Sequence, residues 1–139
     1  MVNLKIDDKK VKVPEGTTVM EAAASMGIRI PSLCYLKEIN EIAACRICLV
    51  ELVGKDKLIT SCNNVVQEGM EIYTNSPKVR NHRRNTVQLL LSQHDNRCVV
   101  CPRNGNCQLQ RVACDLNILD IPFRQEPEYQ PWDKDFPLI

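Results

Sequence analysis

Short runs of alternating apolar and polar residues fill much of the first half of the chain, a period of two that is typical of half-buried β-strands. The runs cover residues 2–6, 10–13, 49–53, 57–61 and 70–74. Asp7-Asp8-Lys9 separates the first two and predicts a hairpin, although the glycine usual in such turns is absent. Gly54 and Gly69 mark turns between the later runs. The pattern predicts a small mixed sheet.

One helix is predicted between these strands, over residues 17–26. Thr18 can cap it, with Glu21 three residues later as in a capping box. Gly27 fits the position just past the helix, and Pro31 prevents a helical continuation. Two strands, a helix, a cysteine-bearing loop and further strands predict a ferredoxin-like β-grasp sheet with one helix packed against it.

The second half of the chain changes to a helical period. Ser76-Pro77 is typical of an N-cap followed by proline at the first helical position, so we expect a helix that runs to about His94. Four residues of this helix follow i, i+3, i+4, i+7 spacing: Val87, Leu90, Leu91 and His94. The spacing predicts that the histidine shares the apolar face. A second short helix is predicted over 108–116.

These elements predict an α+β protein in three parts. Residues 1–75 are expected to form the β-grasp domain, and residues 76–121 a small helical domain. Residues 122–139 contain half of the chain's 8 prolines, interspersed with aromatic residues. Such a composition predicts an extended linker or tail.

Composition limits the class of protein. Apolar residues make up 44% of the chain but aromatics only 4%, so its cores are small and would gain from metal centres. A net charge of +1 gives no field that favours nucleic acid. The first residues do not resemble a signal peptide, and no run reaches the roughly 18 apolar residues of a membrane span. We therefore expect a soluble cytoplasmic protein whose 8 cysteines are reduced, not disulfide-bonded.

Two groups of metal-ligand residues stand out. The first reads C-x10-C-x2-C-x13-C and the second H-x3-C-x2-C-x5-C. Their members are Cys34, Cys45, Cys48 and Cys62 in the first group, and His94, Cys98, Cys101 and Cys107 in the second. A C-x2-C pair suits either zinc or an iron-sulfur cluster, but zinc ribbons more often use two such pairs per site. Ligand count favours two iron-sulfur centres, and a zinc-stapled protein-interaction module is the alternative.

The second group has a fifth candidate ligand, Cys114. If residues 108–116 are helical, Cys114 lies about 10 Å along the helix axis from Cys107, which is far for one compact cluster. His94 needs only a three-residue step to Cys98, so one histidine with three cysteines is favoured over an all-cysteine set. Cys114 is then expected to be a small buried hydrophobe.

A basic run opens the long predicted helix: Lys78, Arg80, Arg83 and Arg84. We interpret this run as a solvated face, with an electrostatic dock for an acidic partner as the alternative. In the zinc-stapled alternative, the three arginines would serve partner docking.

The two motifs, in this order, resemble the N-terminal region of a group of large iron-sulfur oxidoreductases. The resemblance includes the stretch Cys101-Pro102-Arg103-Asn104-Gly105-Asn106-Cys107-Gln108-Leu109-Gln110 and covers nearly the whole chain. The group includes FeFe-hydrogenase catalytic subunits, the large subunit of NAD-dependent formate dehydrogenases and the large iron-sulfur subunit of respiratory complex I. Both a fragment of a longer chain and a free-standing subunit are compatible with the sequence.

The resemblance implies a 2Fe-2S cluster on Cys34, Cys45, Cys48 and Cys62, and a 4Fe-4S cluster on His94, Cys98, Cys101 and Cys107. Centres with all protein ligands filled carry electrons and have no open position for a substrate, so no active site is expected in this chain. The expected partners are a flavin- or NAD(P)H-binding subunit or a ferredoxin on one side. On the other side we expect a hydrogenase or formate dehydrogenase active site, without nucleic acid or a direct membrane span.

Overall fold

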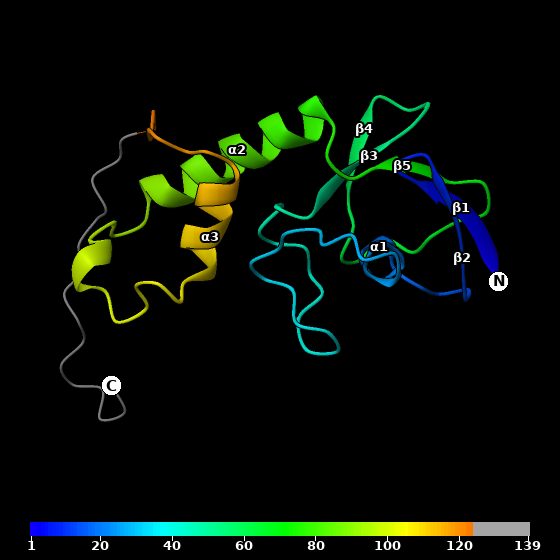
Figure 1. The fold of residues 1–139 in the computed structure, drawn as a ribbon, viewed down its shortest axis with the longest axis horizontal. Coiled ribbons are helices and arrows are strands. Elements are labelled where there is room, and N and C mark those ends of the chain that lie inside the picture. The colour runs from blue at the N-terminus through cyan, green and yellow to red at the C-terminus, as the bar shows by residue number, and fades with distance from the viewer. Residues whose placement is uncertain (124–139) are drawn as a thin grey trace.

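The computed structural model describes residues 1–123, so most of the predicted tail, 122–139, lies outside the described residues. The described part holds a sheet at one end and helices at the other (Figure 1). The strands are β1 Val2–Ile6, β2 Lys9–Val13, β3 Leu49–Leu52, β4 Lys57–Thr60 and β5 Glu71–Tyr73. The helices are α1 Val19–Ser25, α2 Pro77–Ser92, the 3-10 turn η1 Cys98–Val100 and α3 Gln108–Asp115.

The five strands form one mixed sheet in the order β2-β1-β5-β3-β4. Only β1 and β5 run parallel, and the other three pairings are antiparallel. Asp7 and Asp8 turn the first hairpin with φ of 48° and 66°. Aspartate tolerates this left-handed region better than most residues, which explains how the predicted hairpin forms without glycine. The mixed sheet expected from the alternating runs is confirmed.

Helix α1 packs against the sheet and begins as the sequence predicts. The Thr18 side chain accepts a hydrogen bond from the Glu21 N–H, and the Glu21 carboxylate accepts one from the Thr18 N–H. At the other end Gly27 takes φ 76°, and the N–H groups of Gly27 and Ile28 close a Schellman motif on Ala24 and Ala23. The main core lies between this helix and the sheet and includes Leu4, Ile6, Val19, Val50 and Ile72.

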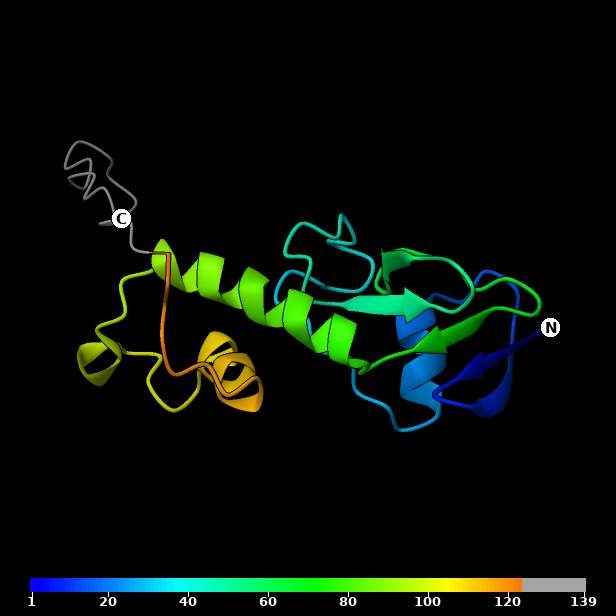
Figure 2. The ribbon, with the colours of Figure 1, turned by 90° about the horizontal axis from the view of Figure 1, so that it is seen from above.

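Helix α2 connects the sheet end of the molecule with the helical end (Figure 2). Ser76 caps it by accepting a hydrogen bond from the Val79 N–H, and Pro77 occupies its first turn, as expected. Helix α3 lies beside it. A second apolar cluster joins the two helices through Val87 and Val112, and its third buried member is Ile47 from the first cysteine loop. The two ends of the molecule therefore share a core.

The predicted faces of α2 were wrong in two respects. The helix ends at Ser92, and His94 is exposed beyond it instead of sharing an apolar face. The buried stripe contains Val79, Arg83 and Val87, at i, i+4, i+8 spacing, so Arg83 does not belong to the solvated basic surface. The first half of α2 packs across β3. This packing decides which side chains of α2 are buried.

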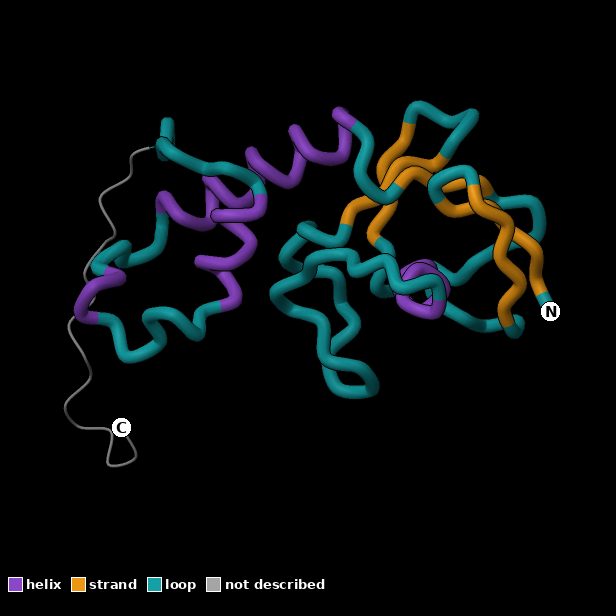
Figure 3. The backbone as a smooth tube through the Cα atoms, viewed as in Figure 1, coloured by secondary structure: helices purple, strands orange, loops and turns teal. Residues whose placement is uncertain are grey.

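By the bounds of the helices and strands, the cysteine groups lie mainly outside regular elements. Figure 3 shows the long loop segments before β3 and between α2 and α3 in teal. In residues 1–123, no helix is both long and apolar enough to cross a membrane.

Candidate iron-sulfur sites

The first cysteine group begins with a pair formed by Cys34 and Cys45. The Cys45 N–H donates to the Cys34 sulfur at 3.4 Å. Burial disfavours the thiolate of Cys45, but N–H groups of Ile47, Leu33 and Cys34 donate to its sulfur and together lower its pKa. Negative charge on this sulfur is thus stabilised by backbone dipoles that the loop fixes in place.

Two residues of this loop, Ala43 and Arg46, adopt the left-handed region, each at φ 55°. Their conformation turns the backbone so that these N–H groups face the Cys45 sulfur. This conformation costs a non-glycine residue roughly 1–2 kcal/mol. Arg46 stands between Cys45 and Ile47, so its conformation bends the chain around the sulfur of Cys45. The two strained residues therefore lower the stability of the fold slightly, and in return the backbone N–H groups are oriented toward the sulfur.

The second pair is Cys48 and Cys62, which are both buried with their sulfurs 3.3 Å apart. The β3–β4 hairpin brings them together, because Leu49 pairs with Thr60 and the Ser61 N–H donates to the Cys48 carbonyl. Burial, followed by the Cys48 thiol, raises the pKa of Cys62 to about 12. The charges of Cys34 and Cys45 act in the same direction, so the other three sulfurs of the group lie within electrostatic reach of Cys62.

This donor set fits a 2Fe-2S centre. It supplies four thiols arranged as two pairs, a soft ligand set of the kind that iron-sulfur clusters use, with backbone donors directed at the sulfurs. Within residues 1–123, no three His, Cys, Asp or Glu side chains gather closely enough to hold a single metal ion. Two separated pairs are less suited to one tetrahedral zinc than to a centre that contains two metals.

The second group follows the end of α2. His94 is exposed in the turn after the helix, Cys98 opens η1, Cys101 occupies the C-cap position of η1, and Cys107 occupies the N-cap position of α3. The three cysteines are half-buried. Consecutive turns link them, since the Cys101 N–H donates to the Cys98 carbonyl. Gly105 adopts φ 76° in the next turn.

These four residues follow one another between α2 and α3, and within residues 1–123 no hydrogen bond joins their side chains, unlike Cys48 and Cys62 of the first group. The described part of the chain shows no ion-binding set of three among them. The turns of the backbone place the second group within one short segment, 94–107.

The expectation that Cys114 is a buried hydrophobe was wrong, because its side chain is exposed. Helix α3 faces the second apolar cluster with Leu109, Val112, Ala113 and Leu116. Cys114 lies two positions after Val112, which places it on the opposite side of the helix.

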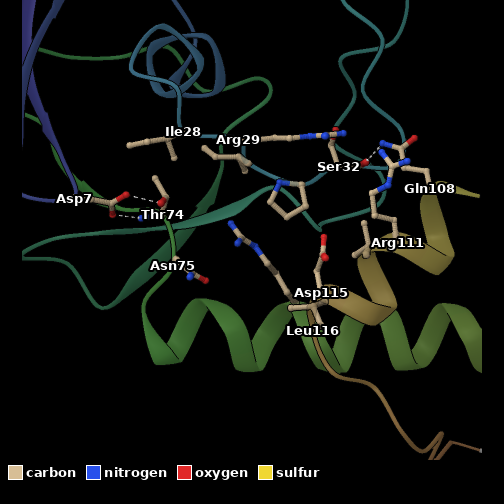
Figure 4. A pocket seen from close by; sticks show the side chains of 14 residues that line it. Asp7, Ile28, Arg29, Ser32, Thr74, Asn75, Gln108, Arg111, Asp115 and Leu116 are labelled. Carbon is tan, nitrogen blue, oxygen red and sulfur yellow. Dashed lines mark hydrogen bonds between the residues drawn. The ribbon is translucent and has the colours of Figure 1, made fainter.

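A cavity of about 520 Å³ lies near both groups, between the segment 28–32 and α3. Figure 4 shows it, with Gln108 bridging its walls by donating from Nε2 to the Ser32 carbonyl at 2.6 Å. No cysteine of residues 1–123 lines it, nor does His94, so it is separate from the two candidate ligand groups.

Sequence reasoning missed one residue beside the first site, Arg83. Its guanidinium donates to the carbonyls of Ile47 and Leu49, on either side of Cys48. The arginine appeared in a run of basic residues, and only its spacing from Val79 and Val87 could have indicated that it faces inward.

Two family models match the chain. Residues 1–77 match a 2Fe-2S iron-sulfur cluster binding domain. Residues 83–122 match an NADH-ubiquinone oxidoreductase-G iron-sulfur binding region. The matches follow the order of the two groups along the chain.

Curated relatives contain the same region. The chain is 41% identical over 128 residues to the NADP-reducing hydrogenase subunit HndD of Solidesulfovibrio fructosivorans, covering 88% of this chain and 22% of that protein. It is 38% identical over 139 residues to the NADPH-Fe(3+) oxidoreductase subunit alpha of Geobacter sulfurreducens, covering 100% of this chain and 16% of the relative. It therefore spans about a fifth of the length of these relatives.

Two further comparisons agree. The chain is 38% identical over 113 residues to the NADH-ubiquinone oxidoreductase 75 kDa subunit of Reclinomonas americana, covering 81% of this chain and 16% of that protein. A chain of an NAD+-reducing [NiFe]-hydrogenase in the H2-reduced state superposes with a TM-score of 0.83 at 28% identity, covering 94% of this chain and 54% of that one.

Fold, cysteine geometry and comparisons lead to the same assignment. The chain is an electron-transfer module that carries a 2Fe-2S and a 4Fe-4S cluster. It belongs to the family of 2Fe-2S iron-sulfur cluster binding domains, here followed by the iron-sulfur region found in NADH-ubiquinone oxidoreductase and NAD(P)-reducing hydrogenase subunits.

Proposed function

We propose that the 2Fe-2S centre is held by Cys34, Cys45, Cys48 and Cys62, with each sulfur pair serving one iron. The pairing is supported by the contact of Cys34 with Cys45 and of Cys48 with Cys62. The centre, when bound, supplies a site that accepts and returns one electron. The N–H groups that donate to Cys45 stabilise negative charge there, and the burial of Cys48 and Cys62 keeps water from their sulfurs.

The 4Fe-4S ligands belong to the same proposal: His94, Cys98, Cys101 and Cys107. Three short turns bring these residues onto one loop, and Cys114 faces away from the α2–α3 core. A neutral imidazole in place of a thiolate removes one negative charge from the ligand set, which favours a higher potential. The division of the chain into a 2Fe-2S unit, 1–75, and a 4Fe-4S unit, 76–121, is part of this proposal.

The 2Fe-2S and 4Fe-4S centres would act as consecutive electron carriers in one electron-transfer path. The observation that carries this proposal is the shared apolar cluster, in which Ile47, between two proposed 2Fe-2S ligands, packs with Val87 and Val112 of the helices that flank the second loop. Rigid packing keeps the two ligand loops at a fixed separation.

The partners follow from the relatives and from the resemblance of the motifs. We propose that a flavin- or NAD(P)H-binding subunit, or a ferredoxin, exchanges electrons at one end. A hydrogenase or formate dehydrogenase active site would exchange them at the other. The setting would be the cytoplasm. This chain would carry no active site of its own, since its proposed centres have all protein ligands filled.

Metal analysis tests the cofactor assignment. We expect about six irons and six acid-labile sulfides per chain after anaerobic purification, and two distinct EPR signals on reduction. A colourless protein that contains zinc and no sulfide would instead establish the zinc-stapled interaction module.

Substitutions test the second ligand set. We expect His94→Cys to retain a 4Fe-4S cluster with a lowered potential, because an added thiolate increases the negative charge of the ligand set. Cys101→Ala should lose this cluster and keep the 2Fe-2S signal. An intact 4Fe-4S signal in the alanine variant would contradict the proposed ligand set.

A further inference from the structure

The Arg83 side chain reaches from α2 to the backbone around Cys48. The residue is only 4% exposed. Its Nε donates to the Ile47 carbonyl at 2.9 Å, and its Nη2 donates to the Leu49 carbonyl at 2.6 Å. These bonds connect a helix of the second unit to a ligand-bearing segment of the first.

Ile47 and Cys48 lie in the turn before β3, and Leu49 is the first residue of that strand. The carbonyls of Ile47 and Leu49 both accept hydrogen bonds from Arg83. The Cys48 carbonyl accepts the Ser61 N–H from beyond β4, at 3.0 Å. On the opposite edge β5 pairs only with Glu51 and Leu52, which leaves the carbonyls before them to Arg83. The backbone around Cys48 is thus fixed by Arg83 on one side and by the Ser61 N–H on the other.

The guanidinium is a buried cation. It forms no ion pair within the described residues 1–123. Burial lowers the pKa of Arg83 to about 10, while the charges of Cys48 and Asp7 favour the cation, so the side chain stays protonated at neutral pH. Asp7 itself accepts hydrogen bonds from the Thr74 N–H and hydroxyl, as Figure 4 shows.

An anionic centre at Cys48 would compensate this buried charge. Four thiolates and two sulfides outweigh two ferric irons, so an oxidised 2Fe-2S centre is negative, and reduction adds one further negative charge. A nearby cation in a medium of low polarity stabilises the reduced form more than the oxidised form.

We propose that Arg83 is a positioning residue for Cys48 whose buried positive charge raises the reduction potential of the 2Fe-2S centre. This inference rests on the proposed ligand set of that centre. On this proposal α2 has two roles. It leads to the loop of the second ligand group, and through Arg83 it also influences the reduction potential of the 2Fe-2S centre.

The test is an anaerobic redox titration of the cluster-loaded chain, with dithionite as reductant and ferricyanide as oxidant. The EPR signal of each centre monitors its reduction. Arg83→Gln keeps a donor for the carbonyls but removes the charge, whereas Arg83→Lys keeps the charge. Arg80→Met is the matched control, since it removes a cation from the same helix at an exposed position.

In Arg83→Gln, we expect the ratio of reduced to oxidised 2Fe-2S at the wild-type midpoint to fall about tenfold, equivalent to about 59 mV for a one-electron couple. Arg83→Lys and Arg80→Met should stay near the wild type. The 4Fe-4S midpoint should move less in every variant, because Arg83 lies about 13 Å from the end of α2 along the helix axis.

An unchanged 2Fe-2S midpoint in Arg83→Gln, or equal shifts in the glutamine and lysine variants, would overturn the inference and leave Arg83 a structural role only. Failure of the lysine variant to retain the centre would overturn it as well. A wild-type chain without a 2Fe-2S signal would instead refute the proposed ligand set.

Discussion

Individual cysteines in this chain differ sharply in environment, although they are the same residue in sequence. Cys48 and Cys62 are buried against each other, whereas Cys114 lies on the solvent side of α3. Thiol reactivity follows exposure and the fraction of thiolate, so the environment of each sulfur decides its chemistry. A buried thiol with a pKa of about 12, as for Cys62, is almost entirely protonated at neutral pH before metal binds.

Alkylation measures these differences. In the cluster-loaded protein under anaerobic conditions, iodoacetamide should modify Cys114 alone, because the other thiols are proposed metal ligands. After removal of the clusters at pH 8, Cys48 and Cys62 should react last. Mass spectrometry of the digested protein identifies the labelled residues. Cys114→Ala should keep both EPR signals, and loss of the 4Fe-4S signal in this variant would show that Cys114 is a ligand.

At the scale of elements, the Glu21 side chain connects α1 with the first cysteine loop. Glu21 closes the capping box with Thr18 and also forms an ion pair with Lys37 at 2.9 Å. Lys37 lies in the loop that follows Cys34. The hydrogen bond from Lys37, followed by the Thr18 N–H, lowers the pKa of Glu21 below its ordinary value of 4.5. The carboxylate therefore stabilises the folded state above about pH 4.5, and this contribution is lost as pH falls through the lowered pKa.

Glu21→Gln should weaken this connection. At pH 6 we expect a loss of roughly 0.2–1 kcal/mol of stability, the usual size of an exposed ion pair, because glutamine can still accept the Thr18 N–H bond. We also expect faster bleaching of visible absorbance in urea. The difference from wild type should shrink as pH falls below 4.5 and through the lowered pKa of the wild-type carboxyl. Glu15→Gln, an exposed carboxyl before the helix, is the control. A difference that persists unchanged at low pH would show that the charge of Glu21 does not contribute.

At the scale of the whole molecule, one small apolar cluster joins the two halves. Ile47, Val87 and Val112 come from the first loop, α2 and α3, and all three are buried. Their contacts, with the bonds of Arg83, are the links by which the state of one half can affect the other. A shared core predicts that both halves unfold in one transition.

Ile47→Ala should cost about 2–5 kcal/mol, because it leaves a cavity in this cluster, and Ile47→Val about 0.5–1.5 kcal/mol. Ile42→Ala, at a loop position that is 71% exposed, should stay within about 0.5 kcal/mol of wild type. Urea unfolding followed by far-UV circular dichroism and by cluster absorbance measures both halves at once. Separate transitions in the wild type, or equal effects of the two alanine variants, would contradict a shared core.

Much of the fold could be predicted because its signals are local. The strands alternate, Thr18 and Glu21 form the expected capping box, and Ser76-Pro77 starts α2 as predicted. Neighbouring side chains and the backbone decide such features within a few residues. The inward face of α2 could not be predicted in the same way, since it depends on where the helix crosses β3.

By itself, the sequence determined the order and types of the elements, the two ligand groups and the family that they indicate, because spacing along a chain limits which metal centres its residues can form. Only the tertiary structure decided that the first four sulfurs form two pairs, that Arg83 lies buried beside Cys48, and that Cys114 faces outward. These features depend on contacts between segments far apart in sequence, which arise when the chain packs and not before.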